Sequence, residues 1–168
     1  LQAGPEWLTR AFRAYGALPA DNAVKAITAA HDFAAGNSGD KLVLSVEYDS
    51  PDPALHTELF VKFARCLGDP FRDRRAGEME GEVRIADLSR HPAFPVAVPK
   101  ACFAGFDPAS GNGLLITERI RFGEGGIEPA LPKNMDHLLA APAEYYRATL
   151  SALARFAAAH QSCRLSPE

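Results

Sequence analysis

Hydrophobic and polar residues alternate along residues 41–48 (KLVLSVEY), a period of two that predicts a β-strand. The next segment, 49–57, contains two prolines and two aspartates and indicates a hairpin loop. An apolar stretch at 58–64 (ELFVKFA) predicts the returning strand. Apolar segments at 100–106 and 113–120, separated by the turn-rich DPASGNG, predict a second hairpin.

Helical spacing of apolar residues appears in other parts of the chain. Residues 5–15 begin with a proline, which the first turn of a helix tolerates, and Gly16 follows as a stop signal. The mixed pattern of residues 22–34 favours a helix that leads into a short strand. The other helices are expected from about Ala76 to Leu88, at 134–140 and at 143–161.

Strands early in the chain and helices late predict an α+β fold in which a mixed lobe precedes a helical one. The mixed lobe is expected at 1–118, with 1–30 as an N-terminal helical extension. A Gly-rich crossover is expected at 119–131 and the start of a helical lobe at 132–168. The chain begins at Leu1 and not at a methionine, which favours an excerpt or a processed chain.

Composition excludes several classes of function. The chain is 47% hydrophobic with a net charge of −3, so it has no basic field for sequence-independent nucleic-acid binding. Its three cysteines form neither a disulfide framework nor a zinc pattern and indicate a reducing compartment. No apolar run of about 20 residues and no leader pattern is visible, so a cytoplasmic protein with no membrane role is expected. The five histidines are scattered, and metal binding by them is not expected.

A lysine stands in the middle of the apolar strand LFVKFAR. Lys62 shares its strand face with Phe60 and Ala64, and burying it requires an anionic partner. The alternative is an edge-strand lysine that extends to water. The helix EMEGEVRIADL supplies a candidate partner, Glu82, beside the expected packing positions. For Glu78 and Glu80, a solvated acidic face is the simpler interpretation.

Two glycine-containing segments complete the candidate chemistry. The segment GNSG (36–39) precedes the strand at 41–48, and such glycines let backbone N–H groups approach phosphate oxygens, although a plain turn explains it equally. In GLLITERIRFGEGG, a buried strand runs into a glycine-rich crossover, which suits either an adenine slot or an interdomain linker.

The order GNSGD, strand, strand with VKF, helix with EVR, VPKACFA, DPASG and LLITERI resembles the aminoglycoside phosphotransferase/choline kinase-like family. Members of that family share the protein-kinase-like fold. The resemblance covers roughly residues 30–122 and is nearest to the uncharacterised bacterial and ecdysteroid-kinase-like members. It implies a kinase-like N-terminal lobe, with an antiparallel sheet and a C-type helix, followed by a hinge and the first helices of a C-terminal lobe.

The resemblance also implies a role for each candidate residue, with ATP and Mg²⁺ as cofactors and a small-molecule hydroxyl as the phosphoryl acceptor. Lys62 would contact the α- and β-phosphates, and Glu82 would orient Lys62. Ser38 and Gly39 would cover the phosphates. The carbonyl of Glu118 and the amide of Ile120 would hold adenine, with Ile116 or Thr117 near the back of the slot.

The chain departs from the family pattern after the crossover. Residues 119–168 contain one aspartate, Asp136, and one asparagine, Asn134, and no His-x-Asp motif. Phosphoryl transfer in this fold needs two aspartates in separate roles, so we expect no catalytic residue in this chain and no activity from it alone. The alternative is a non-catalytic α+β binding or interaction domain, including a pseudokinase. In either case, self-association through 143–161 is expected.

Overall fold

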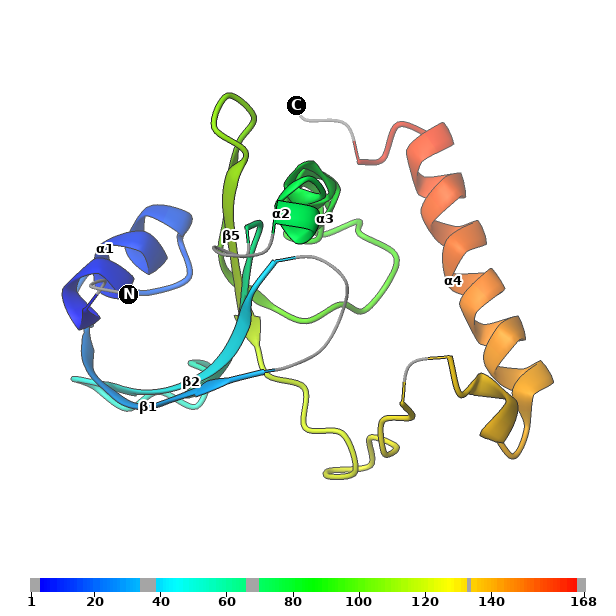
Figure 1. The fold of residues 1–168 in the computed structure, drawn as a ribbon, viewed down its shortest axis with the longest axis horizontal. Coiled ribbons are helices and arrows are strands. Elements are labelled where there is room, and N and C mark those ends of the chain that lie inside the picture. The colour runs from blue at the N-terminus through cyan, green and yellow to red at the C-terminus, as the bar shows by residue number, and fades with distance from the viewer. Residues whose placement is uncertain (1–3, 34–38, 66–69, 133, 166–168) are drawn as a thin grey trace. The chain divides into compact units, whose positions relative to one another are not determined.

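A five-stranded antiparallel sheet organises the α+β fold (Figure 1). The computed structural model describes residues 4–33, 39–65, 70–132 and 134–165. Its strands are β1 (Val24–Asp32), β2 (Lys41–Tyr48), β3 (Glu58–Phe63), β4 (Ala101–Asp107) and β5 (Asn112–Glu118). Its helices are α1 (Pro5–Tyr15), α2 (Pro70–Asp73), α3 (Met79–Leu88) and α4 (Pro142–Gln161), with short 3₁₀ turns at Ala76–Glu78 and Asp136–Leu138.

The strands lie in the order β1-β2-β3-β5-β4, so β3 occupies the centre of the sheet. The first three strands follow one another as a meander, and β4 and β5 form a second hairpin that adds to β3 through β5. By its contacts the chain divides into two compact units. One comprises Leu1–Asp87 and Pro99–Arg119, and the other comprises Leu88–Val98 and Ile120–Glu168.

The two faces of the sheet carry different cores. Alternation along each strand puts Leu59, Val61 and Ile116 on the face that packs against α1. Phe12 of α1 is almost completely buried there. The opposite face holds a smaller cluster in which α3 and the turn before it pack against the ends of β3, β4 and β5; its buried members are Ala64, Ala76, Met79 and Val83.

The expectation of a helix within residues 22–34 is wrong, because Val24–Asp32 forms strand β1. Its pairing with β2 runs from Val24 opposite Tyr48 to Asp32 opposite Leu42. The segment mixes strand-favouring Val24, Ile27 and Thr28 with three alanines, so its local pattern is ambiguous and pairing with β2 completes the strand. The segment expected to be helical at 134–140 contains only the single 3₁₀ turn at Asp136–Leu138.

The second unit is built around α4. Phe156 packs edge-on against Phe94, with ring centroids 5.6 Å apart, and Ala159 is buried. The hydroxyl of Tyr146 donates a hydrogen bond to the Asp136 carboxylate, which raises the pKa of Tyr146. The Tyr146 side chain itself is exposed. Within the described ranges, no helix is both long and apolar enough to cross a membrane.

Candidate functional site

The candidate site begins at Lys62 on the central strand. In the sheet register, Lys62 stands opposite Lys41 of β2 on one side and Leu115 of β5 on the other. Because β3 is paired along both edges, the interpretation of an edge-strand lysine is wrong. Only 15% of the Lys62 side chain is exposed, so its charge needs a partner within the protein.

The partner is the carboxylate of Glu82. Helix α3 buries Met79 and Val83 against the sheet, and Glu82 precedes Val83 directly. There, the Lys62 ammonium donates a hydrogen bond to the Glu82 carboxylate, and the two form an ion pair. The Glu82 side chain is 43% exposed, so the pair lies at the rim of the packed cluster.

This arrangement fixes a positive charge on the α3 face of the sheet. A lysine ammonium has three N–H donors, and one donor serves Glu82. The remaining donors can therefore serve an anion. The arrangement is suited to holding phosphate oxygens, since Lys acts toward phosphate as a point charge.

A second carboxylate lies near the same lysine. Glu78 accepts a hydrogen bond from Arg75 Nε at 2.7 Å. That bond lowers the pKa of the Glu78 carboxyl, and the nearby charge of Lys62 adds to the effect. Glu78 is thus bonded to Arg75, and the hydrogen bond from Lys62 goes to Glu82.

Gly39 lies at the end of the loop that precedes β2, while Ser38 and the rest of GNSG fall outside the described residues. Gly39 has a φ of +57°, and a Cβ atom on it would stand 1.7 Å from the carbonyl oxygen of Phe63. The neighbouring Asp40 carbonyl accepts a hydrogen bond of 2.8 Å from the Phe63 amide. The close approach of two backbones explains why glycine is needed here, and it places Gly39 and Asp40 beside Phe63, the residue next to Lys62.

An apolar surface with one aromatic pair adjoins the lysine on the same sheet face. Phe60 shares that face with Lys62 and packs edge-on against Phe33 of the neighbouring loop end, with ring centroids 5.4 Å apart. Val43 stands opposite Phe60 on β2 and is buried. Sequence reasoning missed Lys41 and Phe33 because only the pairing of β1, β2 and β3 brings them beside Lys62 and Phe60. The alternation along 41–48 already put Lys41 and Val43 on one face.

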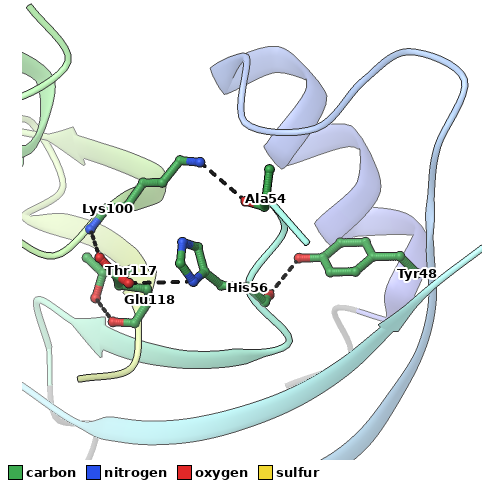
Figure 2. Close-up of polar contacts among 6 residues, drawn as sticks. All are labelled: Tyr48, Ala54, His56, Lys100, Thr117 and Glu118. Carbon is green, nitrogen blue, oxygen red and sulfur yellow. Dashed lines mark hydrogen bonds and ion pairs between the residues drawn. The ribbon is translucent and has the colours of Figure 1, made fainter. Parts of the chain in front are cut away.

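At the far end of β5, Glu118 is held by several contacts (Figure 2). Its backbone carbonyl accepts a hydrogen bond of 3.0 Å from Thr117 Oγ1. Its side-chain Oε1 accepts one of 2.7 Å from the Lys100 amide, and Oε2 lies 3.5 Å from His56 Nδ1. Sequence reasoning treated His56 as one scattered histidine, and no local pattern could have linked residues 56 and 118.

Ile120, expected to offer its amide, is half-buried and is the first residue of the second unit after β5. Asn134 and Asp136, the asparagine and the aspartate that follow the crossover, lie in the same unit. Asp136 accepts the hydrogen bond from Tyr146, and Asn134 has a φ of +66°. Among the residues that the structure describes, no three His, Cys, Asp or Glu side chains are grouped as a metal site.

Comparisons with known proteins do not assign the chain to a family. No protein-family model matches it, and neither the curated proteins nor the solved structures contain a match.

Proposed function

We propose that the first unit is the ATP-binding portion of a kinase-like phosphotransferase that transfers the γ-phosphoryl group to a hydroxyl of a small molecule. The observation that carries the proposal is the Lys62–Glu82 ion pair between the central strand and α3. In protein kinases, a lysine of the third strand contacts the phosphates and a glutamate of the following helix orients it.

The arrangement of the strands supports the same proposal. The helix with Glu82 lies between the third and fourth strands in the chain, and the strand with Lys62 pairs with β2 and β5. Gly39 and Asp40, just before β2, lie against the backbone of Phe63, the residue next to Lys62. Each part of the proposed phosphate site therefore comes from a different element of one sheet and its helix.

In this proposal the protein supplies positive charge to the phosphates and holds the nucleotide in place. Lys62 neutralises charge on the α- and β-phosphate oxygens, and Glu82 keeps the ammonium in place. The apolar surface around Val43 and Phe60 suits a planar base, and the Glu118 carbonyl offers it an acceptor. Mg²⁺ bound with the nucleotide would supply further positive charge for the phosphates. In the complete reaction the acceptor oxygen would bond to the γ-phosphorus as the bond to the β-phosphate oxygen breaks, so that ADP leaves and the hydroxyl proton passes to a base. The described residues offer no candidate aspartate for that base.

The test is a calorimetric titration of the 168-residue chain with MgATP. We expect Lys62→Met to raise the dissociation constant of ATP about 10- to 100-fold, the effect of losing a hydrogen bond to a charged group. The matched control is Lys25→Met, which removes an exposed lysine of β1 that lies 3.9 Å from Glu47. We expect the control to bind ATP like the wild type.

Equal ATP affinity in the wild type and in Lys62→Met contradicts the proposal. If the folded wild type binds no nucleotide, the Lys62–Glu82 pair is a structural bridge. The alternative of a non-catalytic α+β interaction domain or pseudokinase is then favoured.

A further inference from the structure

Two lysines stand directly opposite each other on neighbouring strands of the sheet. Lys41, the first residue of β2, pairs with Lys62 of β3 in the antiparallel register. Residues in such a pair lie on the same face of the sheet, with Cβ atoms about 4.5–5.5 Å apart. Like charges placed in this way repel each other and destabilise a sheet. An anion held between the two ammonium groups would remove that repulsion.

The contacts of the two ammonium groups differ. Lys62 Nζ forms the ion pair with the Glu82 carboxylate. Lys41 Nζ donates a hydrogen bond of 3.3 Å to the backbone carbonyl of Gly39. A hydrogen bond to a neutral carbonyl positions the Lys41 ammonium without neutralising its charge. Since an ammonium has three N–H donors, neither of these contacts uses all the donors of its lysine.

Both lysines also start from restricted positions. The Lys62 side chain is 15% exposed, and Lys41 is half-buried. Gly39, whose carbonyl Lys41 contacts, is itself buried against the backbone of Phe63. Side chains that are already held lose less conformational entropy when a ligand binds. The two positive charges are therefore in place before an anion arrives.

The lysine pair adjoins the apolar surface that the proposed function assigns to the base. Val43 and Phe60 form the next cross-strand pair on the same sheet face. The Phe33 amide donates a hydrogen bond of 2.9 Å to the Lys41 carbonyl, and the Phe33 ring packs against Phe60. A ligand with a planar base on this surface would direct an attached phosphate chain toward both lysines.

We propose that Lys41 is a second phosphate-binding residue, which holds the polyphosphate chain of the nucleotide together with Lys62 from the adjacent strand. The inference rests on the proposed nucleotide function and adds a residue that determines specificity. A polyphosphate chain contacts both ammonium groups at once, whereas a nucleoside without phosphate contacts neither. Lys41 thus favours nucleotides with a polyphosphate chain over nucleosides.

The experiment measures, by calorimetry, the binding of inorganic tripolyphosphate and, separately, of adenosine to the full 168-residue chain. We expect Lys41→Met to raise the dissociation constant of tripolyphosphate about 10-fold, the effect of losing a hydrogen bond to a charged group. It should leave the affinity for adenosine unchanged. Lys62→Met should have the same pattern of effects. Lys41→Arg keeps the positive charge and should retain most of the tripolyphosphate affinity.

Lys25→Met is the matched control, because it changes the net charge by the same amount as Lys41→Met. Lys25 lies on β1, 3.9 Å from Glu47. Glu47 is six residues further along β2 than Lys41, about 20 Å away in a strand. We expect Lys25→Met to bind tripolyphosphate like the wild type, which separates the lysine pair from a general effect of charge.

The possible failures are distinguishable. If Lys41→Met binds tripolyphosphate like the wild type while Lys62→Met binds it more weakly, the role of Lys41 is wrong and the nucleotide proposal stands. If Lys41→Arg loses as much affinity as Lys41→Met, or if Lys41→Met also weakens adenosine binding, Lys41 acts through the fold and the role is wrong. If the folded wild type binds neither ligand, both proposals fail.

Binding of tripolyphosphate without adenosine, still weakened by Lys41→Met, supports the lysine pair and contradicts the base site. Thermal melting of each variant shows whether it is folded. Lys41→Gln gives the same test if Lys41→Met does not fold.

Discussion

Burying the charged Lys62 side chain in a central strand costs free energy, and the ion pair with Glu82 offsets part of that cost. Exposed ion pairs contribute about 0–1 kcal/mol, and Glu82 is half-exposed, so the pair adds little net stability. Removing Glu82 alone would leave the mostly buried ammonium without a counter-charge, which is more damaging than removing both groups. The pair is therefore better understood as fixing the position of Lys62.

Gly39 is the residue at which adding a single methyl group should lower the stability of the fold most clearly. We expect Gly39→Ala to lower the free energy of unfolding by at least about 2 kcal/mol, because its φ is positive and the new Cβ meets the Phe63 carbonyl. Urea denaturation measures the change.

The control for Gly39→Ala is Gly81→Ala in α3, where a Cβ has nothing within 4 Å. A helix-interior glycine replaced by alanine should raise stability by about 0.5–1 kcal/mol. Equal effects of the two substitutions would contradict the close approach at Gly39.

Among the elements, α3 is the one on which the candidate site depends most. It reaches the sheet through a small cluster in which Met79 is almost completely buried, one turn before Glu82. Few side chains hold this helix, so the position of Glu82 is sensitive to each of them.

We expect Met79→Ala to lower stability by about 2–5 kcal/mol, since it removes a large side chain from a closed cluster. It should also weaken ATP binding, because α3 is then less firmly held against β3. Chemical denaturation and calorimetric titration measure the two effects.

Ile85→Ala is the matched control in the same helix, at an exposed position. It should change stability by less than about 1 kcal/mol and leave ATP affinity unchanged. If Met79→Ala binds ATP as tightly as Ile85→Ala does, the position of α3 does not govern the site.

For the whole molecule, the division into two units separates the candidate site from α4. Lys62, Glu82, His56 and Glu118 all belong to the first unit. In the second unit, α4 presents a stripe of exposed apolar side chains at helical spacing. Leu150 and Leu153 are 65% and 59% exposed, and Tyr146 lies one turn before them. Such a stripe at the surface favours association.

We expect the chain to self-associate through α4 at high concentration and Leu150→Glu to reduce that association, because a charge at the centre of the stripe opposes burial. Sedimentation velocity over a range of concentrations measures it. Ser151→Glu, which adds the same charge on the other side of the helix, should associate like the wild type. A wild type that stays monomeric throughout contradicts the prediction.

Most of the regular elements were predictable from local pattern. The alternation at 41–48 corresponds to β2, and the proline and glycine around 5–15 correspond to the first turn and the C-cap of α1. The segment at 22–34 was not assigned correctly, because its local pattern is mixed and the pairing with β2 that completes strand β1 is not visible within the segment.

Part of the candidate site was also predictable from local pattern. A lysine in an apolar strand demands a counter-charge, so Lys62 and a carboxylate on the following helix were visible together. The contact of His56 with Glu118 was not, because the two residues are 62 positions apart and each is unremarkable among its neighbours.

By itself, the sequence determined where most of the strands and helices form and which charged side chain is out of place in an apolar segment, since both follow from local periodicity and the cost of burying charge. Only the tertiary structure decided that β3 is central, that α3 delivers Glu82 to Lys62, and that a loop histidine reaches the end of β5. Those outcomes depend on strand order and register, which are set by pairing between distant segments and leave no signal in any one of them.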